Sequence, residues 1–174
     1  MKDLIRIAVT GPESTGKSML TRQLAEKFGT VWVPEYAREY IDRLDRPYNE
    51  EDILVISRGQ MEREEQKAAV AERILFCDTE LTVTRIWSEV KYGRCHPWII
   101  ESLATHPYDL YLLCNIDIPW ENDPQREHPD LREHLFSLYF NELTRRNCRF
   151  EVVSGLGPER LLNAIRLIRK NTDI

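Results

Sequence analysis

The chain has 174 residues, of which 30% are charged, and its net charge is −5. This length is enough for one domain that buries most of its apolar surface without disulfide bonds. The acidic balance argues against broad binding to nucleic acids or anionic membranes, and no apolar run approaches the length of a membrane span. Because residues 1–3 lead directly into the first expected strand, we expect no secretory leader and a cytoplasmic location.

The four cysteines are widely spaced and form no C-x-x-C pair (Cys77, Cys95, Cys114 and Cys148). This spacing predicts reduced thiols rather than disulfide bonds or a zinc site. Two of the cysteines fall within expected buried strands, where a thiol behaves as a small apolar side chain.

Apolar runs of strand length alternate along the chain with longer amphipathic stretches. This alternation predicts a parallel sheet with helices on both faces. We expect strands at residues 4–10, 31–33, 73–77, 110–115 and 150–153. We expect helices at residues 17–28, 36–44, 51–71, 82–92, 97–105, 130–146 and 159–170. Ligands of such sheets bind beyond the carboxyl ends of the strands, so the residues after each strand are the candidates for chemistry.

The first expected strand leads into the octapeptide GPESTGKS at residues 11–18. Its pattern G-x-x-x-x-G-K-[ST] is typical of a phosphate-binding loop, in which glycines let backbone N–H groups wrap around phosphate oxygens. Lys17 would reach the β- and γ-phosphates, and the Ser18 hydroxyl would bind Mg²⁺. We therefore expect ATP to be bound by the loop and the next residue, namely Gly11, Glu13, Ser14, Thr15, Gly16, Lys17, Ser18 and Met19.

The second expected strand is followed by Glu35, Arg38 and Glu39, which share one face of a helix. A carboxylate here, such as Glu35, could accept the proton of a substrate hydroxyl, while Arg38 pairs with that carboxylate or with a phosphate. The alternative is an ordinary surface ion pair at a helix N-terminus.

The third expected strand is followed directly by Asp78, an acid in the position of a Walker B motif. Asp78 would hold Mg²⁺ opposite Ser18. Alternatively, Asp78 or Thr79 caps the next helix, and both roles are compatible. Glu80 is a weaker candidate for a second metal or substrate carboxylate.

Several aromatic side chains lie near these positions. Trp87 and Tyr92 are on the helix after Asp78, and Tyr36 follows the second strand. Each is a candidate to stack on a flat substrate ring, although aromatic residues at helical spacing also serve as core.

The fourth expected strand is followed by a segment rich in proline and charge, which predicts a lid over residues 117–132. A lid can deliver an arginine to the transferred phosphoryl group; Arg126 is our first candidate and Arg132 the second. The alternative is an exposed connector. Asn115 and Asp117 superficially resemble a guanine-reading motif, but its lysine is missing and the spacing is one residue short. The turn at residues 154–160 is placed where related folds contact adenine, or is a plain strand-to-helix turn.

These motifs together resemble the nicotinamide riboside kinase domain of the NadR-type proteins, over essentially the whole chain. The resemblance rests on residues 11–18, Glu-Tyr-x-Arg-Glu at 35–39, Cys-Asp-Thr-Glu at 77–80 and Trp-x-x-Asp-x-x-Arg at 120–126. It implies a three-layer P-loop NTPase fold, similar to nucleoside kinases, in a single domain at residues 1–174 with a lid. It also implies that ATP and Mg²⁺ are used to phosphorylate the ribose 5′-hydroxyl of nicotinamide riboside, which yields nicotinamide mononucleotide for NAD salvage.

Carried over by motif, the resemblance implies site roles that agree with those above. The expected catalytic residues are Lys17, Asp78, Glu35 and Arg126, and the expected metal ligands are Ser18 and Asp78. The expected substrate-binding residues are Glu35, Tyr36, Arg38, Trp87 and Tyr92. Position alone does not choose between Glu35 and Asp78 as the general base.

Many NadR-type relatives carry a nucleotidyltransferase domain, and some carry a DNA-binding helix-turn-helix, ahead of the kinase. Because Met1 lies only a few residues before the first expected strand, we expect neither activity in this chain. The expected partner is a small-molecule nucleoside, without nucleic acid or membrane, and a homo-oligomer stays open.

Two other functions also stay open. One is another P-loop kinase that acts on a nucleoside, a nucleotide or another small hydroxylated metabolite. The other is a nucleotide-dependent ATPase switch that changes its protein partners.

Overall fold

The computed structural model describes residues 4–174; residues 1–3, on which the expectation of no leader rests, lie outside it. Its strands are β1 (Ile5–Thr10), β2 (Trp32–Val33), β3 (Ile74–Asp78), β4 (Leu110–Cys114) and β5 (Phe150–Val153). All pair in parallel, in the order β2-β3-β1-β4-β5. The central β1 places Ile7 opposite Phe76 of β3 and Leu110 of β4. The predicted α/β class and five-stranded parallel sheet are therefore confirmed.

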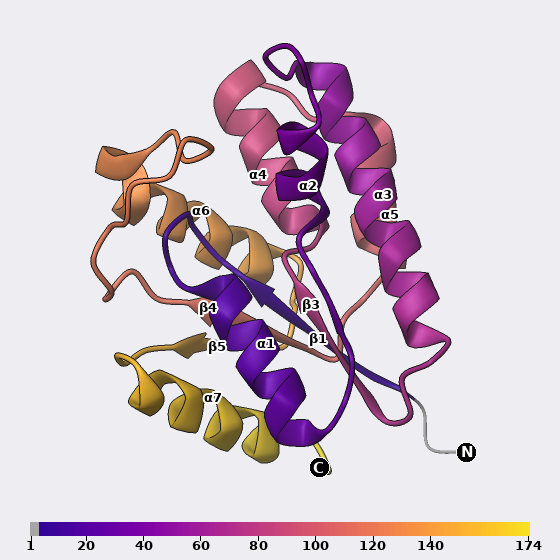
Figure 1. Cartoon of the computed structure of the whole chain (residues 1–174), viewed down its shortest axis with the longest axis vertical. Helices are drawn as coiled ribbons and strands as arrows, with labels where there is room; N and C mark the ends of the chain where they lie inside the picture. The colour runs from indigo at the N-terminus through magenta and orange to yellow at the C-terminus, as the bar shows by residue number, and fades with distance from the viewer. Residues whose placement is uncertain (1–3) are drawn as a thin grey trace.

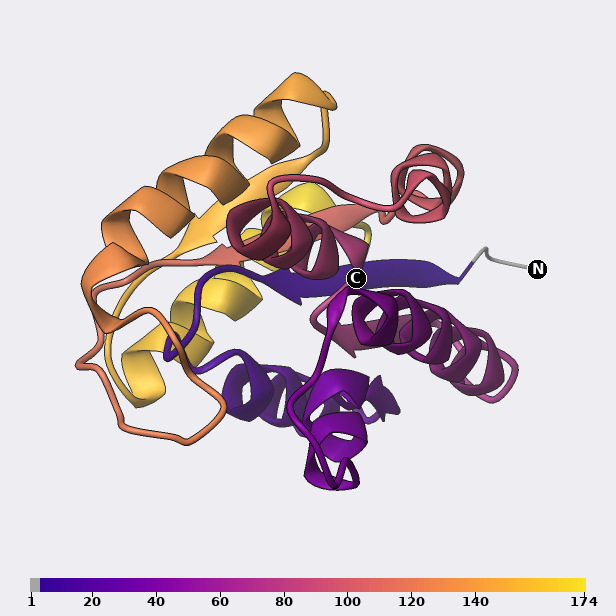
Figure 2. The same cartoon turned by 90° about the horizontal axis from the view of Figure 1, so that it is seen from above.

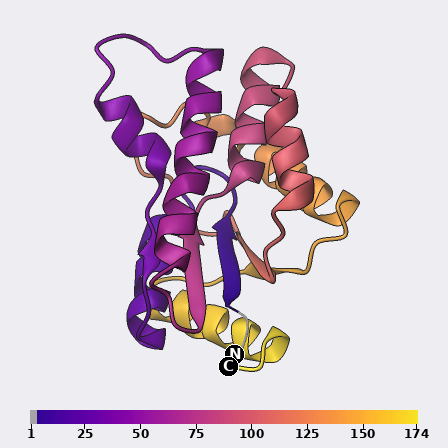
Figure 3. The same ribbon diagram turned by 90° about the vertical axis from the view of Figure 1, so that its right-hand side faces the viewer.

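The helices are α1 (Lys17–Phe28), α2 (Tyr36–Asp42), α3 (Glu50–Ala68), α4 (Leu81–Tyr92), α5 (Pro97–Thr105), α6 (Arg132–Arg145) and α7 (Pro158–Asn171). A short 3₁₀ helix, η1 (Pro129–Leu131), precedes α6, so α6 begins later than expected. Figures 1 and 2 show α1 and α7 on one side of the sheet and α6 on the other. Figure 3 shows α3, α4 and α5 side by side. Among residues 4–174, no helix is both long and apolar enough to cross a bilayer.

Alternate residues of the strands face opposite layers. Ile7 and Val9 of β1 pack toward α1 and α7, whereas Ala8 packs toward α4 and α6. Because both faces are covered, β3 and β4 are buried along their whole lengths. The four cysteines are free thiols, and Cys77 and Cys114 lie buried in these two strands.

The start of α4 differs from expectation. Its N-cap is Glu80, whose carboxylate accepts hydrogen bonds from Thr82 N (2.7 Å) and Thr10 Oγ1 (3.0 Å). The alternative in which Asp78 or Thr79 caps this helix is therefore wrong. Glu80 is 1% exposed and is committed to these bonds, so its suggested metal or substrate contact is not supported either.

Candidate active site

The phosphate-binding loop connects the end of β1 to the start of α1. Gly11 has φ = 132°, and a Cβ there would lie 3.0 Å from the carbonyl oxygen of Cys114, so only glycine fits against β4. Gly16, with φ = 74°, is the N-cap of α1 and supplies no side-chain cap. The first N–H groups of α1 are therefore available to an anion, as a phosphate site requires.

Lys17 folds back over this loop. Its Nζ donates to the carbonyl oxygens of Gly11 (3.0 Å) and Pro12 (2.7 Å). Phosphate oxygens in the loop would offer this ammonium group charged acceptors, which form stronger hydrogen bonds than neutral carbonyls. The structure thus places the Lys17 ammonium over the loop, and its contact with phosphate stays a prediction.

Asp78 lies at the end of β3, beside β1, and is 1% exposed. Its Oδ1 has no hydrogen-bond partner among the described residues. Burial and the nearby Glu35 carboxylate raise the pKa of Asp78 to about 7, against the opposing effects of the Ser18 hydroxyl and the Lys17 ammonium. A buried carboxylate oxygen without a partner, close to a serine hydroxyl, suits Mg²⁺, which commonly takes one or two protein ligands together with substrate phosphates.

Glu35 follows β2 and is the N-cap of α2, but its side chain makes no capping bond. It lines a cavity of about 570 Å³ that also contains the phosphate-binding loop. Asp78 does not line this cavity, but the Glu35 carboxylate lies close enough to Asp78 to raise its pKa, although the two residues follow from different strands, β2 and β3. Both remain candidates for the general base.

The same cavity extends from the loop toward α2 and α4. Two further predicted substrate residues, Arg38 and Trp87, line it. Met19 and the loop residues 11–18 line it as well. Its volume is in the range of sites for small molecules and cofactors.

Tyr36 and Tyr92 are not among the residues that line this cavity. The Tyr36 ring lies under the Arg63 guanidinium (4.5 Å) and against Gly59 of α3. Tyr92 packs onto the apolar cluster that joins α3, α4 and α5. The geometry gives both tyrosines packing contacts, and their predicted stacking on substrate has no support from their positions.

Tyr48 is a cavity residue that sequence reasoning missed. It lies in the connection between α2 and α3, where its hydroxyl accepts a hydrogen bond from Trp87 Nε1 (2.9 Å). The two rings meet edge to face, with centroids 4.8 Å apart. The only signal in the sequence is an aromatic residue after a proline, which fits no motif.

The predicted lid contacts the phosphate-binding loop at several points. Ser14 Oγ accepts hydrogen bonds from Glu121 N (2.8 Å) and Arg126 Nη1 (3.3 Å). Arg132 Nη2 donates to the carbonyl oxygen of Ser14 (3.1 Å). Glu13 accepts a hydrogen bond from the N–H of His128 (3.0 Å). Both candidate lid arginines therefore reach the loop.

The lid also contacts the far side of the cavity. Arg38 of α2 pairs with Asp123 (2.9 Å), and Lys91 of α4 pairs with Glu127 (3.0 Å). Tyr48 donates to the Glu127 carboxylate (2.8 Å). Figures 1 and 2 show this segment looping out between β4 and α6. It spans the cavity from the phosphate-binding loop to α2 and α4.

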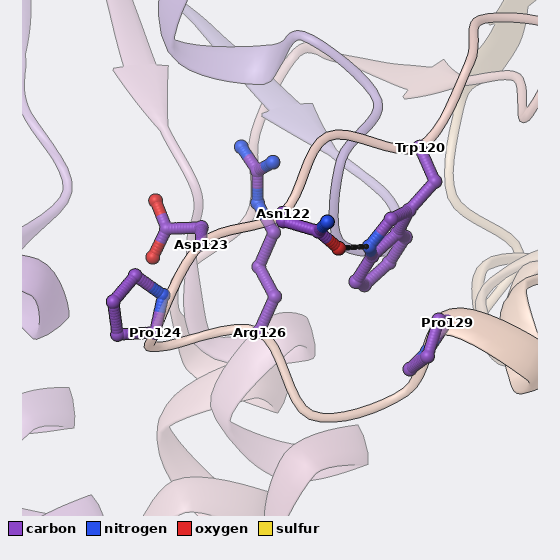
Figure 4. A pocket seen from close by; sticks show the side chains of 6 residues that line it. All are labelled: Trp120, Asn122, Asp123, Pro124, Arg126 and Pro129. Atoms are coloured by element: carbon purple, nitrogen blue, oxygen red, sulfur yellow. Dashed lines mark hydrogen bonds between the residues drawn. The ribbon is translucent and has the colours of Figure 1, made fainter.

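A smaller hollow of about 320 Å³ lies within the lid itself. Figure 4 shows the Arg126 side chain extending between Asp123 and Trp120, with Trp120 hydrogen-bonded to Asn122 (3.1 Å). The guanidinium of Arg126 is thus carried on an irregular loop, without a helix or strand to fix it.

Asp117 does not stand free as a guanine reader would. Its carboxylate accepts hydrogen bonds from Gly155 N (2.6 Å) and Arg160 Nη1 (2.7 Å). The structure thus brings the turn at residues 154–160 to the start of the lid, and Leu156, Gly157 and Arg160 line the large cavity. Arg160 belongs to this predicted turn, but sequence reasoning assigns it no role of its own.

Comparisons with known proteins identify the family and the fold. A family model described as an AAA domain matches residues 6–160. The chain is 27% identical to the trifunctional NAD biosynthesis/regulator protein NadR of Escherichia coli and 29% identical to that of Salmonella typhimurium, in each case over 94% of this chain. It spans 42% of the length of those relatives.

Solved structures show the same fold. A NadR protein in complex with NR superimposes with a TM-score of 0.83 at 21% identity, over 98% of this chain and 51% of that one. A NadR protein with NAD and AMP-PNP gives 0.82 at 22% identity, over 98% and 50%. Thymidylate kinase from Ehrlichia chaffeensis gives 0.70 at 12%, over 97% and 99%. The predicted resemblance to the NadR-type proteins and the nucleoside-kinase-like P-loop fold are confirmed.

Proposed function

Because the chain belongs to the AAA domain family, whose model covers residues 6–160, we propose that it is an ATP-dependent kinase of nicotinamide riboside. It would transfer the γ-phosphoryl group of ATP to the ribose 5′-hydroxyl and produce nicotinamide mononucleotide. One observation carries the proposal: a single cavity joins the phosphate-binding loop to Glu35 and to the Tyr48–Trp87 pair. The NadR relatives crystallised with NR and with AMP-PNP support the choice of ligands.

Donor and acceptor would enter this cavity from opposite sides. The triphosphate lies in residues 11–18, with its terminal phosphate near Lys17 and Asp78. The acceptor occupies the part lined by Glu35, Arg38 and Trp87. This arrangement aligns the hydroxyl with the γ-phosphoryl group, and alignment is a large part of catalysis in phosphoryl transfer.

Charge stabilisation would come from the loop and the lid. Lys17 and Arg126 carry the positive charges that face the transferred group, and Arg126 already contacts Ser14 of the loop. Mg²⁺ held by Ser18 and Asp78 would neutralise charge on the phosphate oxygens. The lid excludes water from the phosphoryl group while it bridges the cavity.

We favour Glu35 as the general base. Glu35 lines the cavity, whereas Asp78 is 1% exposed and lies near the Ser18 hydroxyl, which suits a metal ligand better than a base. A carboxylate that lines the acceptor side can reach the proton of the substrate hydroxyl.

The riboside ring would lie against Trp87. Pyridinium carries a positive charge, and an indole face attracts cations. Tyr48 fixes the indole through a hydrogen bond, and the Glu127 carboxylate lies at the same tyrosine hydroxyl. Because Lys91 already pairs with the Glu127 carboxylate (3.0 Å), the preference for a cationic base over a neutral one rests on the indole face of Trp87.

The test is a panel of acceptors assayed with ATP and Mg²⁺: nicotinamide riboside, thymidine, deoxyadenosine, thymidylate and no acceptor. We expect phosphorylation of nicotinamide riboside at least about 100-fold faster than that of the neutral nucleosides. Preference for a neutral nucleoside or a nucleotide would favour another P-loop kinase. ATP hydrolysis that no acceptor changes would favour a nucleotide-dependent switch.

The domain organisation belongs to the same proposal. One domain at residues 1–174, with residues 117–132 as its lid, would carry the whole reaction. Its partner would be a small-molecule nucleoside, without nucleic acid or membrane, in the cytoplasm.

A further inference from the structure

The N-terminus of α2 carries Glu35, the carboxylate that we favour as the general base. Glu35 occupies the N-cap position, from which a side chain commonly accepts a hydrogen bond from the first N–H groups of its helix. Its carboxylate accepts no such bond from the described part of the chain, although the N–H groups at a helix start need acceptors. One of these N–H groups instead finds its acceptor on another helix.

That acceptor is the side chain of Gln60, on α3. Its Oε1 accepts a hydrogen bond from the Tyr36 N–H (2.9 Å), which is the first N–H group of α2. Gln60 is only 3% exposed, and glutamine is seldom so buried unless its amide is hydrogen-bonded. Because Gln60 satisfies the start of α2 from α3, the Glu35 carboxylate is available to the cavity that it lines.

The amide nitrogen of Gln60 faces the end of β3. Nε2 lies 3.4 Å from the carbonyl oxygen of Asp78 and 3.5 Å from that of Thr79, which makes a long, shared hydrogen bond. Pairing between β2 and β3 ends one residue before Asp78. Beyond that point, Gln60 links the backbone after Glu35 to the backbone of Asp78.

Packing around Gln60 holds the first turn of α2 in the same place. A Cβ at Gly59 would lie 2.2 Å from Cε1 of Tyr36, so only glycine leaves room for this ring against α3. The Arg63 guanidinium covers the ring (4.5 Å) and pairs with Glu39 of α2. Helix α2 therefore packs on α3 (Figure 1) through contacts that start at its first residue.

We propose that Gln60 is a positioning residue for phosphoryl transfer, because it caps α2 from α3 and sets the distance between Glu35 and Asp78. Gln60 is not among the residues that line the cavity, so it acts through Glu35 and not on the substrate. A misplacement of about 1 Å can cost about 100-fold in rate. The inference rests on the proposed function in that Glu35 is taken as the base.

The experiment is a double-mutant cycle on kcat, with Gln60→Met, Glu35→Gln and the double variant. Methionine fills a similar space but cannot replace the hydrogen bonds of the amide. We expect Gln60→Met to lower kcat for the fastest acceptor of the panel by about 10- to 100-fold, with KM for ATP within about twofold. In the Glu35→Gln background the same substitution should change kcat by less than about twofold, because the base that Gln60 positions is already lost.

A second readout does not depend on activity. Hydrogen exchange at the Tyr36 N–H should be at least about tenfold faster in Gln60→Met, because its acceptor is gone, and unchanged in Glu35→Gln. Ser57→Ala is the matched control, since Ser57 is buried on the same helix and its hydroxyl donates to the carbonyl oxygen of Ile53 within that helix. This control should change neither kcat nor the exchange at Tyr36.

Gly59→Ala is the second variant if Gln60→Met does not fold. Alanine favours the helix itself, but its methyl group meets the Tyr36 ring and displaces the start of α2 from α3. We expect kcat to fall by a similar factor, again with KM for ATP within about twofold. A Gly59→Ala variant with the kcat of the wild type would contradict the inference.

The inference is also overturned if Gln60→Met keeps kcat within about threefold, or if its effect multiplies fully with that of Glu35→Gln. An impaired Glu35→Gln beside an unimpaired Gln60→Met removes the inference alone. The proposed function fails separately, if nicotinamide riboside is not phosphorylated while another acceptor of the panel is; the cycle run with that acceptor then still decides the role of Gln60. A Glu35→Gln variant with full kcat would remove both the base and the inference.

Discussion

The phosphate-binding edge of the sheet and the lid above it are built in opposite ways. The edge consists of backbone at the ends of the strands. Gly11 and Gly16 adopt positive φ angles, which glycine permits, and the Asp78 side chain is buried, at 1% exposed. The chain is irregular from Asn115 to His128, which includes most of the proposed lid, and this segment is held by side-chain pairs between partly exposed residues, such as Lys91 with Glu127. The edge therefore holds its charged groups in fixed positions, whereas the segment that we propose as a lid is held by contacts that are individually weak.

In the proposed reaction, the phosphate-binding edge would supply the catalytic charges and the lid would control access to the cavity. Preorganised charge costs stability, because the Asp78 carboxylate is buried with an oxygen that has no partner among the described residues. The lid contacts change the free energy of unfolding little, since exposed ion pairs are worth about 0 to 1 kcal/mol each. Changes at the edge should therefore alter both stability and chemistry, and changes in the lid should alter mainly the chemistry or the binding of the acceptor.

The largest effect is expected from Lys17→Ala, which removes the ammonium group from the preorganised edge. We expect kcat to fall by at least about 1,000-fold, because a donor aimed at developing charge is lost. The measurement is the ATP-dependent phosphorylation of nicotinamide riboside. Lys27→Ala, in the last turn of the same helix, is the control and should keep full activity. A Lys17→Ala variant with more than a tenth of wild-type activity would contradict the role of the loop.

Asp78→Asn should separate stability from activity at the edge. We expect activity to fall by about 100-fold or more, because a charged ligand of the metal is lost. In metal-free buffer at pH 8 we expect the variant to be more stable to urea, by at most about 4 kcal/mol, since the unfavourable buried charge is gone.

The sign of this pH effect follows from the pKa of Asp78, which is raised to about 7 in the folded protein. Between pH 4 and pH 7 the folded state binds the proton more tightly than the unfolded state, so ionisation of Asp78 lowers stability as pH rises. The gain in Asp78→Asn should accordingly be small at pH 4 and largest at pH 8. An equal gain in stability at pH 4 and pH 8 would show that ionisation of the Asp78 carboxylate does not destabilise the folded protein.

Arg126→Met tests whether the lid takes part in chemistry. We expect kcat to fall by about 50-fold, the stability to stay unchanged, and KM for ATP to change by less than about threefold, because the arginine acts mainly in the transition state. The control is Arg22→Met, on an exposed position of α1. If KM for ATP rises while kcat is kept, Arg126 binds the ground state and is not the catalytic arginine.

The smallest effect is expected from Glu127→Gln, which weakens the contact of the lid with Lys91 and Tyr48. We expect KM for nicotinamide riboside to rise about threefold, and the difference from wild type to shrink at high salt, as a partly exposed ion pair requires. Glu26→Gln, which removes an exposed pair with Arg22 on α1, should have no effect. A loss of kcat above about 100-fold would place Glu127 in the chemistry and remove the contrast between edge and lid.

The same contrast explains how much could be predicted from the sequence. Strands, helices and the loop at residues 11–18 depend on local periodicity and on a motif, so α1 and α5 begin and end at the expected residues. Asp78 was predicted because position after a strand is a local property. Lid contacts such as Arg38 with Asp123 join residues 85 apart, and no local pattern specifies them.

The structure differs from the sequence-based predictions where the role of a residue depends on the direction of its side chain. Glu80 rather than Asp78 or Thr79 caps α4, because the backbone turns Asp78 toward Ser18 and leaves Glu80 beside Thr82. Tyr36 and Tyr92 point toward α3 and its neighbours, whereas Tyr48, in a loop without a motif, faces the cavity. A sequence shows that an aromatic residue is near a site, but tertiary packing decides which way its ring points.

The most direct test of the account is a crystal structure of the protein with Mg²⁺, a non-hydrolysable ATP analogue and nicotinamide riboside. The account predicts the phosphates within residues 11–18, the metal at Ser18 and Asp78, and the pyridinium ring on Trp87 with the ribose 5′-hydroxyl at Glu35. A riboside bound away from Glu35 and Trp87, or a triphosphate outside the loop, would contradict the account.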